Sequence, residues 1–360
     1  MQRIFAVILT YNRKELLKRC LDAIYSQTRP CDGVIVIDNA SCDGTQQQLL
    51  QAGYPNLEIY VLSQNIGAAG GFNVGFRLAY QAGADFVWMM DDDVIPQPRA
   101  LQCLLEADEL LSIKNVDRVF LISTALTESG FITNTPSLNL SLNKIGYSGW
   151  PKMVEHGIVP VRRATFVSIL VPRSTLAEYG LPIASMFIWG EDAEYTLRIT
   201  QEKPGFLVGA SKVLHLRQEN GPISILSEKN PARLKYHRYF IRNKIFIARK
   251  HSWRHRQVVL EVYGNFCLMN KLLCMGEFHK AWVISQGLIG GVFFYPDTET
   301  ADAPIEALKI SIRSLAKSPC VSSEARALKQ AHDAVAELAL APDFSESYNL
   351  QGDDIQRGSV

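Results

Sequence analysis

Three consecutive aspartates, Asp91, Asp92 and Asp93, follow directly after the apolar run 86–90. Such a run predicts a buried strand, and open α/β sheets bind their ligands at the carboxyl ends of their strands. Adjacent carboxylates repel one another unless a cation or hydrogen bonds offset their charge. Mg²⁺ and Mn²⁺ favour carboxylate and phosphate oxygens. The run therefore predicts a divalent metal site that holds a diphosphate, with a solvated acidic turn as the simpler alternative.

A second acidic group, Glu191, Asp192 and Glu194, follows Trp189 about a hundred residues later. The three carboxylates fall in the first turn of an expected helix, where they complement the helix dipole. An aromatic ring beside carboxylates also suits a sugar site in which one carboxylate removes a proton from an acceptor hydroxyl. The first acidic group favours this second interpretation. His215 ends an expected strand and is a further metal-ligand candidate, although a lone histidine there is more often a core residue.

Polar residues also follow the other expected strands. They are Thr10, Tyr11 and Asn12 after the first, Asp38 after the second and Asn65 after the third. Because the carboxyl ends of parallel strands meet at one edge of a sheet, we expect these side chains near the aspartates. Asp38 suits a nucleoside hydroxyl or base N–H, and a turn role fits it equally well. Gly70 lies in a small-residue segment that permits close ligand approach at a helix N-terminus, but this segment matches neither GxGxxG nor a P-loop.

Apolar runs and helical patterns alternate through the first half of the chain. The runs predict strands at 4–9, 34–37, 57–62 and 86–90. The spacing of apolar residues predicts helices at 16–24, 46–51, 72–81 and 99–111. Later elements are expected as strands at 165–171 and 206–216, a helix at 192–201 and site-framing loops at 124–162. The alternation predicts an α/β fold with a mostly parallel sheet covered by helices on both faces.

The composition describes a large globular chain of 360 residues, 47% hydrophobic, with a net charge of +1. We expect a catalytic domain at 1–230, a basic and amphipathic helical region at 231–341 and a polar tail at 342–360. The seven cysteines form no CxxC pair, which indicates reduced thiols and a cytosolic protein. The N-terminus lacks a signal-peptide pattern. The longest apolar stretch, 281–296, is shorter than the roughly 20 residues of a membrane-spanning helix.

Taken in order, these segments resemble the inverting glycosyltransferases of family 2, which have the GT-A fold. The resemblance covers residues 3–250 and rests on 10–12, 38–44, 65–71, 91–93, 190–194 and His215. The segment 236–243 resembles the galactofuranosyltransferase and rhamnosyltransferase branch, and Asp-Ala-Glu-Tyr at 192–195 is closer to the galactofuranosyltransferases. The resemblance implies a Rossmann-like, mostly parallel sheet with helices on both faces, followed by a helical C-terminal extension.

The resemblance also implies a role for each residue. The nucleotide-sugar would be bound by Thr10, Tyr11, Asn12, Asp38, Asn65, Gly70, Asp91 and Asp92. Asp93 and His215 would hold Mn²⁺ or Mg²⁺. Asp192 would be the catalytic base, and Trp189, Glu191 and Glu194 would bind the acceptor. A single in-line displacement needs one base, and the metal would offset the charge on the departing diphosphate.

The implied activity is metal-dependent transfer of a sugar to a glycan or lipid-linked glycan in bacterial surface polysaccharide synthesis. UDP-galactofuranose is the first donor expected, and dTDP-rhamnose is the alternative. A nucleotidyltransferase would need a glycine-rich, lysine-bearing loop after the first strand, which 10–13 does not supply. A non-catalytic glycan-binding protein with the same fold is a more remote alternative.

The segment 229–260 carries ten Lys and Arg residues, no acidic residue and several interleaved aromatic residues. An ordinary solvated helix would explain this basic composition. Binding to nucleic acid is not expected, because the whole chain is nearly neutral. Basic residues near anionic lipid contribute about 1 kcal/mol each. We therefore expect a cytoplasmic enzyme that binds peripherally to the cytoplasmic face of the inner membrane. The apolar helices after residue 258 would contact lipid or a second copy of the chain.

Overall fold

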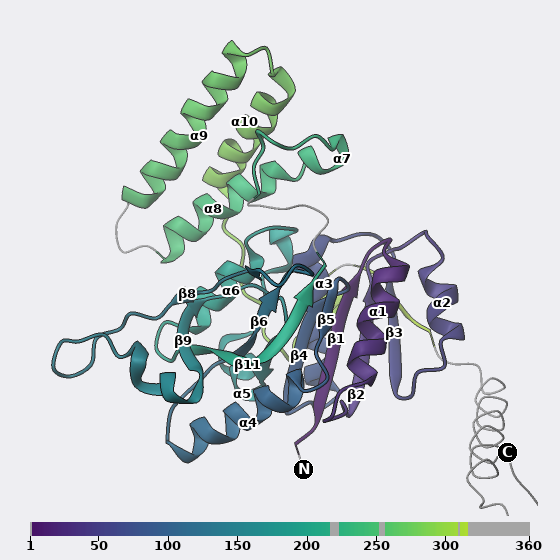
Figure 1. Cartoon of the computed structure of the whole chain (residues 1–360). Helices are drawn as coiled ribbons and strands as arrows, with labels where there is room; N and C mark the ends of the chain where they lie inside the picture. The colour runs from purple at the N-terminus through teal and green to yellow at the C-terminus, as the bar shows by residue number, and fades with distance from the viewer. Residues whose placement is uncertain (1, 217–222, 252–255, 309, 316–360) are drawn as a thin grey trace, which may run out of the picture. The chain divides into compact units, whose positions relative to one another are not determined.

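The computed structural model describes residues 2–216, 223–251, 256–308 and 310–315. The core is one sheet in which β1 (Ile4–Thr10), β2 (Gly33–Asp38), β3 (Leu57–Leu62) and β4 (Phe86–Asp91) run parallel. The strand order is β12-β3-β2-β1-β4-β10-β6-β11-β9-β8 (Figure 1). The expectation of a mostly parallel α/β sheet is confirmed.

The second half of the sheet mixes strand directions. β10 (Ile169–Pro172) is antiparallel to both β4 and β6 (Leu121–Leu126), whereas β11 (Gly205–His215) is parallel to β6. The strand expected at 165–171 therefore begins only at Ile169. Short strands β5 (Val94–Pro96), β7 (Ile132–Thr133), β8 (Ser137–Leu138), β9 (Ile158–Arg163) and β12 (Ile312–Ser314) complete the sheet.

Alternating side chains of β1 divide the core into two layers. Ile4, Ala6 and Ile8 pack on the face that is covered by α1 (Lys14–Tyr25) and α4 (Ala100–Ile113). Phe5, Val7 and Leu9 pack on the opposite face. That face is covered by α3 (Gly67–Gln81), α5 (Arg173–Tyr179) and α6 (Glu191–Ile199). Strands buried on both sides explain why the first four read as unbroken apolar runs. The helix α2 (Thr45–Gln51) follows β2.

The C-terminal helices form their own apolar cluster. They are α7 (Pro231–Leu234), α8 (His237–His251), α9 (Arg256–Cys274) and α10 (Phe278–Phe293) (Figure 1). After α10 the chain returns to the sheet, where Glu299 pairs with the buried Arg77 of α3. Residues 1–316 form one compact unit, so the boundary expected at residue 230 falls inside it. The expected polar tail at 342–360 lies outside the described residues.

No helix among the described residues is long and apolar enough to cross a membrane. Three 3-10 helices lie in the connections: η1 (Trp150–His156), η2 (Ala184–Met186) and η3 (Ile305–Leu308). Of these, η2 matters most for the site, because the loop after it leads directly into α6.

Candidate functional site

The carboxyl ends of β1, β2 and β4 bring four of the expected residues together. Thr10 pairs with Asp38 in the parallel register, and Leu9 pairs with Asp91. The Thr10 hydroxyl donates a 2.7 Å hydrogen bond to Asp92 Oδ2, which fixes that carboxylate at the end of the sheet. Asp38 is fully buried, and its Oδ1 accepts from the Ser41 amide at 2.9 Å while its Oδ2 has no partner. Asp38 thus stabilises a turn through Oδ1 and keeps Oδ2 as an acceptor for a ligand.

Asp93 and His215 are brought together by the antiparallel pairing of β5 with β11, in which Val94 lies opposite His215. Asp93 Oδ1 lies 3.4 Å from His215 Nε2 and makes no hydrogen bond. His215 Nδ1 lies 2.8 Å from Asn134 Oδ1, an oxygen that can only accept, so Nδ1 carries a proton. When the ring is neutral, the Nε2 lone pair therefore faces the Asp93 carboxylate. This donor pair fits a divalent cation, whose ligands are oriented by such outer hydrogen bonds.

Two ligands do not complete a coordination shell. Among the described residues, no group of three or more His, Cys, Asp or Glu side chains could hold a metal ion. A cation at Asp93 and His215 would therefore need oxygen ligands from a bound molecule or from water, as Mg²⁺ commonly does in phosphate sites.

Arg13 is the residue at this edge that the sequence analysis did not single out. It lies directly before α1, and its Nη1 lies 3.2 Å from Asp92 Oδ1 and 2.9 Å from Asp93 Oδ2. Burial raises the pKa of Asp92 to about 6, although Arg13 and Thr10 act in the opposite direction. Burial also acts to raise the pKa of Asp93, but His215 and Arg13 outweigh it and hold that pKa below its usual value. The position of Arg13 directly after Asn12 was the sequence signal that could have placed Arg13 at this edge.

The second acidic group lies beside the first. Burial raises the pKa of Asp91 well above its usual value, with further contributions from Asp93, Asp92 and Asp192. Burial and then the charge of Asp192 raise the pKa of Glu191, to which Asp91 also contributes. Burial likewise raises the pKa of Asp192. Carboxylates from β4 and from the first turn of α6 therefore share one poorly hydrated site, in which a carboxylate is a stronger base than in water.

A strained loop precedes α6. Phe187 has φ 67° and ψ −67°, Trp189 has φ 62° and Gly190 has φ 111°. The Ile188 amide donates to the Met186 carbonyl at 2.8 Å, so Phe187 is the centre of a γ-turn. Left-handed backbone at non-glycine residues costs on the order of 1–3 kcal/mol each and often marks functional sites.

Trp189 is half-buried, and its environment is aromatic. Its ring centroid lies 5.0 Å from that of His237 and 6.1 Å from that of Phe240, both on α8. Phe187 stacks on Tyr239 of the same helix at 4.7 Å. The expected acceptor-binding tryptophan is therefore part of a ring cluster between the loop and α8.

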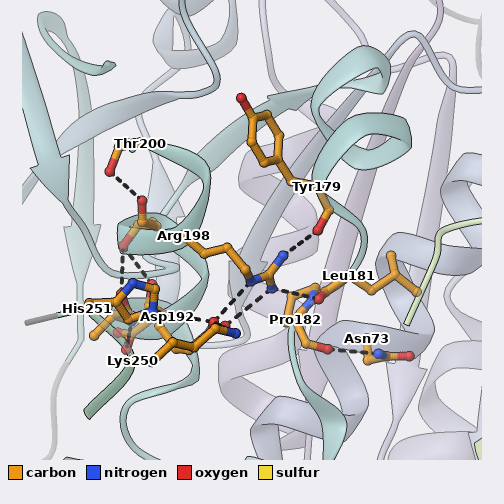
Figure 2. Close-up of polar contacts among 12 residues, drawn as sticks. Asn73, Tyr179, Leu181, Pro182, Asp192, Arg198, Thr200, Lys250 and His251 are labelled. Carbon is orange, nitrogen blue, oxygen red and sulfur yellow. Dashed lines mark hydrogen bonds and ion pairs between the residues drawn. The ribbon is translucent and has the colours of Figure 1, made fainter. Parts of the chain in front are cut away.

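Glu194 is oriented differently from an acceptor-binding residue. Its carboxylate is fully buried and lies 3.0 Å from Arg198 Nε, 3.0 Å from Lys250 Nζ and 3.5 Å from His251 Nε2. Arg198 also donates to the carbonyls of Tyr179 and Leu181 (Figure 2). Burial opposes ionisation, but the contact with His251 and the charges of Arg198 and Lys250 lower the pKa of Glu194 to about 2. The carboxylate is thus held inside the protein, where it ties α6 to α8.

The remaining expected residues mostly shape loops. Asn12 Oδ1 accepts from the Cys42 amide at 2.7 Å, and Asn65 Oδ1 accepts from the Gly67 amide at 2.8 Å. Tyr11 is 43% exposed and available to a ligand. The space beside Gly70 is filled by the Ile66 side chain. The close approach falls instead at Gly67, where a Cβ would lie 2.1 Å from the Phe187 carbonyl oxygen.

Comparison with known sequences identifies the first part of the chain. Residues 5–111 match the family model of glycosyl transferase family 2. Galactofuranosyltransferase GlfT1 of Mycobacterium tuberculosis is 32% identical over 200 residues, which cover 55% of this chain and 64% of the relative. GlfT1 of Mycolicibacterium smegmatis is 30% identical over 207 residues, with 55% and 65% covered. The match therefore spans slightly less than two thirds of the length of these relatives.

Comparison with solved structures supports the fold. The crystal structure of GalNAc-T7 with UDP, GalNAc and Mn²⁺ aligns with a TM-score of 0.50 and 14% sequence identity. The alignment covers 69% of this chain and 50% of that one. Asp192 and His215 lie beyond the residues that the family model matches. The aspartates at the end of β4 lie within them, so this part of the chain is similar to glycosyl transferase family 2.

Proposed function

We propose that the protein is a metal-dependent inverting glycosyltransferase, which moves a sugar from a nucleotide diphosphate donor to an acceptor hydroxyl. The observation that carries the proposal is the meeting of the two acidic groups. Burial raises the pKa of Asp91 at the end of β4, neighbouring aspartates add to this, and Asp192 of α6 is close enough to contribute as well. One group suits a donor diphosphate and the other an acceptor. Galactofuranose from UDP-galactofuranose is the first sugar proposed, because the relatives named above are galactofuranosyltransferases. Rhamnose from dTDP-rhamnose is the alternative.

The donor would lie along the carboxyl ends of β1, β2 and β4. Asp38 offers its unpartnered Oδ2 to the nucleoside, and the exposed ring of Tyr11 lies at the same edge. Asp93 and His215 would hold Mn²⁺ or Mg²⁺, and the cation when bound offsets negative charge on the departing diphosphate. Arg13 already places a positive charge between Asp92 and Asp93, so it is suited to contact the same phosphates.

The acceptor would approach the first turn of α6. Asp192 is partly exposed and has a raised pKa, so its carboxylate is suited to remove the acceptor proton. Glu191 and Trp189 would orient the acceptor, and Glu191 has a buried Oε2 without a partner. We assign Glu194 to the support of α6, because its carboxylate is surrounded by cations.

We further propose a lipid-linked glycan acceptor at the cytoplasmic face of the inner membrane, in bacterial surface polysaccharide synthesis. Large apolar side chains are exposed at helical spacing along α9 and α10. They include Val259, Tyr263, Phe266 and Leu273 on α9, and Phe278, Trp282, Ile289 and Phe293 on α10. Helices that expose apolar stripes beside basic residues suit the interface of an anionic membrane. A second copy of the chain is the alternative partner.

Calorimetric titration of the purified chain with UDP, dTDP, GDP and CDP, with and without Mn²⁺, tests the donor site. We expect Mn²⁺-dependent binding of UDP. Binding of dTDP instead would favour the rhamnose alternative. If none of the four nucleotides binds, the glycosyltransferase proposal fails. The aspartates are then best explained as an acidic turn that pairs with Arg13.

A further inference from the structure

The loop 186–190 is held from one side by a single buried side chain. Asn243 of α8 is fully buried, and its Nδ2 lies 3.0 Å from the Met186 carbonyl oxygen, 3.1 Å from that of Ile188 and 2.9 Å from that of Trp189. Three loop carbonyls, one before and two after the central residue Phe187 of the γ-turn, therefore converge on one amide group. Buried carbonyls without such a donor would be costly, so the amide favours this particular path of the loop.

Arg242, the neighbour of Asn243, fixes the amide. Arg242 Nε and Nη2 donate to Asn243 Oδ1 at 3.1 and 3.0 Å, which orients the amide with its NH₂ group towards the loop. Arg242 Nη2 also reaches the carbonyls of Ser185 and Met186, each at 2.9 Å. Because its guanidinium is used in this way, Arg242 belongs to the loop support and not to a phosphate site.

The opposite side of the loop rests on the start of α3. The Phe187 carbonyl accepts from the Ala69 amide at the start of α3, at 3.0 Å. At the end of the loop, Gly190 has φ 111°, and a Cβ there would lie 3.3 Å from Cβ of Asn243. The Gly190 carbonyl then accepts the Glu194 amide at 2.8 Å, which begins α6. Because the loop contacts α8 and continues into α6, the position of α8 determines the position of the first turn of α6.

We infer that Asn243 is a positioning residue, which holds the strained loop 186–190 in the conformation that presents Asp192 to the acceptor. The inference rests on the proposed function, since it takes Asp192 as the base. It assigns α8 a role in the reaction: the helix holds the loop through Asn243 and supports α6 through Lys250, whose Nζ lies 3.0 Å from Glu194. Asn243 itself is fully buried and enclosed by loop carbonyls, so it would act through the loop.

The test compares Asn243→Ala and Asn243→Asp with Ile245→Ala. Asp keeps the shape of the side chain and removes the NH₂ donors. Ile245 lies on the same helix, is 2% exposed and packs in the apolar cluster of the C-terminal helices, so its truncation controls for destabilisation alone. Hydrogen exchange in peptides that cover 185–195 should rise in both Asn243 variants and stay at the wild-type level in Ile245→Ala.

Turnover is measured on the full chain with UDP-galactofuranose and octyl β-galactofuranoside. A displaced base costs rate on the order of 10²-fold, so kcat should fall by about that factor in the Asn243 variants while UDP affinity is unchanged. If Ile245→Ala loses kcat equally, or if the Asn243 variants keep it, the inference is overturned while the proposed function stands. A wild-type chain that binds UDP but transfers no sugar overturns the proposed function, and the role of Asn243 with it.

Discussion

Asp93 Oδ1 and His215 Nε2 lie 3.4 Å apart, although the two residues come from distant parts of the chain. The contact exists because the short strand β5 pairs with the end of β11. The Leu216 amide donates to the Asp93 carbonyl at 2.8 Å, so the backbones of the two residues are also tied together. A carboxylate and an imidazole held on paired strands form a more rigid donor pair than two side chains on loops would.

The first prediction concerns metal-dependent nucleotide binding. Changing Asp93 or His215 to Ala removes one of the two protein donors. Loss of an outer-shell partner already weakens metal affinity on the order of 10–100-fold, so loss of a direct ligand should weaken it at least as much. UDP binding in the presence of Mn²⁺ should weaken correspondingly, and EDTA should have the same effect on the wild type. Calorimetry measures both. His279→Ala removes an exposed histidine on α10 and should change nothing. Equal UDP binding by all three variants would remove Asp93 and His215 from the metal site.

The second prediction concerns the base. Asp192→Asn keeps the size of the side chain but cannot accept a proton, so kcat should fall on the order of 10²–10⁴-fold while UDP binding persists. Asp117→Asn, an exposed site, is the control. Because the base acts when deprotonated and its pKa is raised above 3.8, wild-type kcat should be lost as the pH falls through a value above 3.8. Full turnover by Asp192→Asn would show that Asp192 is not the base.

The third prediction concerns stability. The folded-state pKa of Glu194 is about 2, against an ordinary value of 4.5. Its contribution to stability is therefore complete above pH 4.5 and is lost as the pH falls towards 2, with a total of about 3 kcal/mol. Glu194→Gln should lower the free energy of unfolding by about 3–5 kcal/mol at pH 7, because it leaves buried cations unpaired.

Urea denaturation at pH 7 and pH 3 measures this effect. The difference between wild type and Glu194→Gln should be smaller at pH 3, where the wild-type carboxylate has lost part of its contribution. Glu178→Gln removes the exposed pair with Lys203 and should cost less than about 1 kcal/mol. A similarly small cost at Glu194 would contradict the assignment of this residue to the support of α6.

The parallel half of the sheet could be predicted because its signal is local. Residues 4–9 and 86–90 are apolar without interruption, as strands buried on both faces must be. Placing Asp38 and Asp91 at one edge then follows from parallel direction alone. The strand pattern around β10 does not reveal its antiparallel direction, and the three-residue β5 carries no comparable pattern. The geometry that joins Asp93 to His215 could therefore come only from the resemblance to a family.

The support of the site could not be predicted, because it depends on tertiary contacts. Asn243 is a polar residue in a helix, and nothing in its local sequence distinguishes it from a solvated position. Arg13 precedes α1, and only its position directly after Asn12 could have indicated it. The role of Glu194, in contrast, could have been predicted from its spacing. At about 100° per helical residue it lies about 200° around α6 from Asp192, on nearly the opposite face of the helix. Helical geometry thus separates the base from its supporting carboxylate, although both belong to one acidic run.

The last prediction concerns the apolar surface of α9 and α10. Phe266, Phe278 and Trp282 are 50%, 68% and 60% exposed. Changing all three to Ser should weaken binding to vesicles of phosphatidylglycerol and phosphatidylethanolamine on the order of 100-fold, if each ring contributes about 1 kcal/mol on burial in lipid. Phe131→Ser, which removes a 72% exposed ring near β7, should bind as wild type does.

Vesicle flotation measures the loss of binding. Vesicles of neutral phosphatidylcholine should bind less protein, because basic residues of α8 contribute only with anionic lipid. The opposite outcome is a wild-type chain that fails to bind vesicles and sediments as a dimer. If the triple change then dissociates that dimer, this surface binds a second copy of the chain and not lipid.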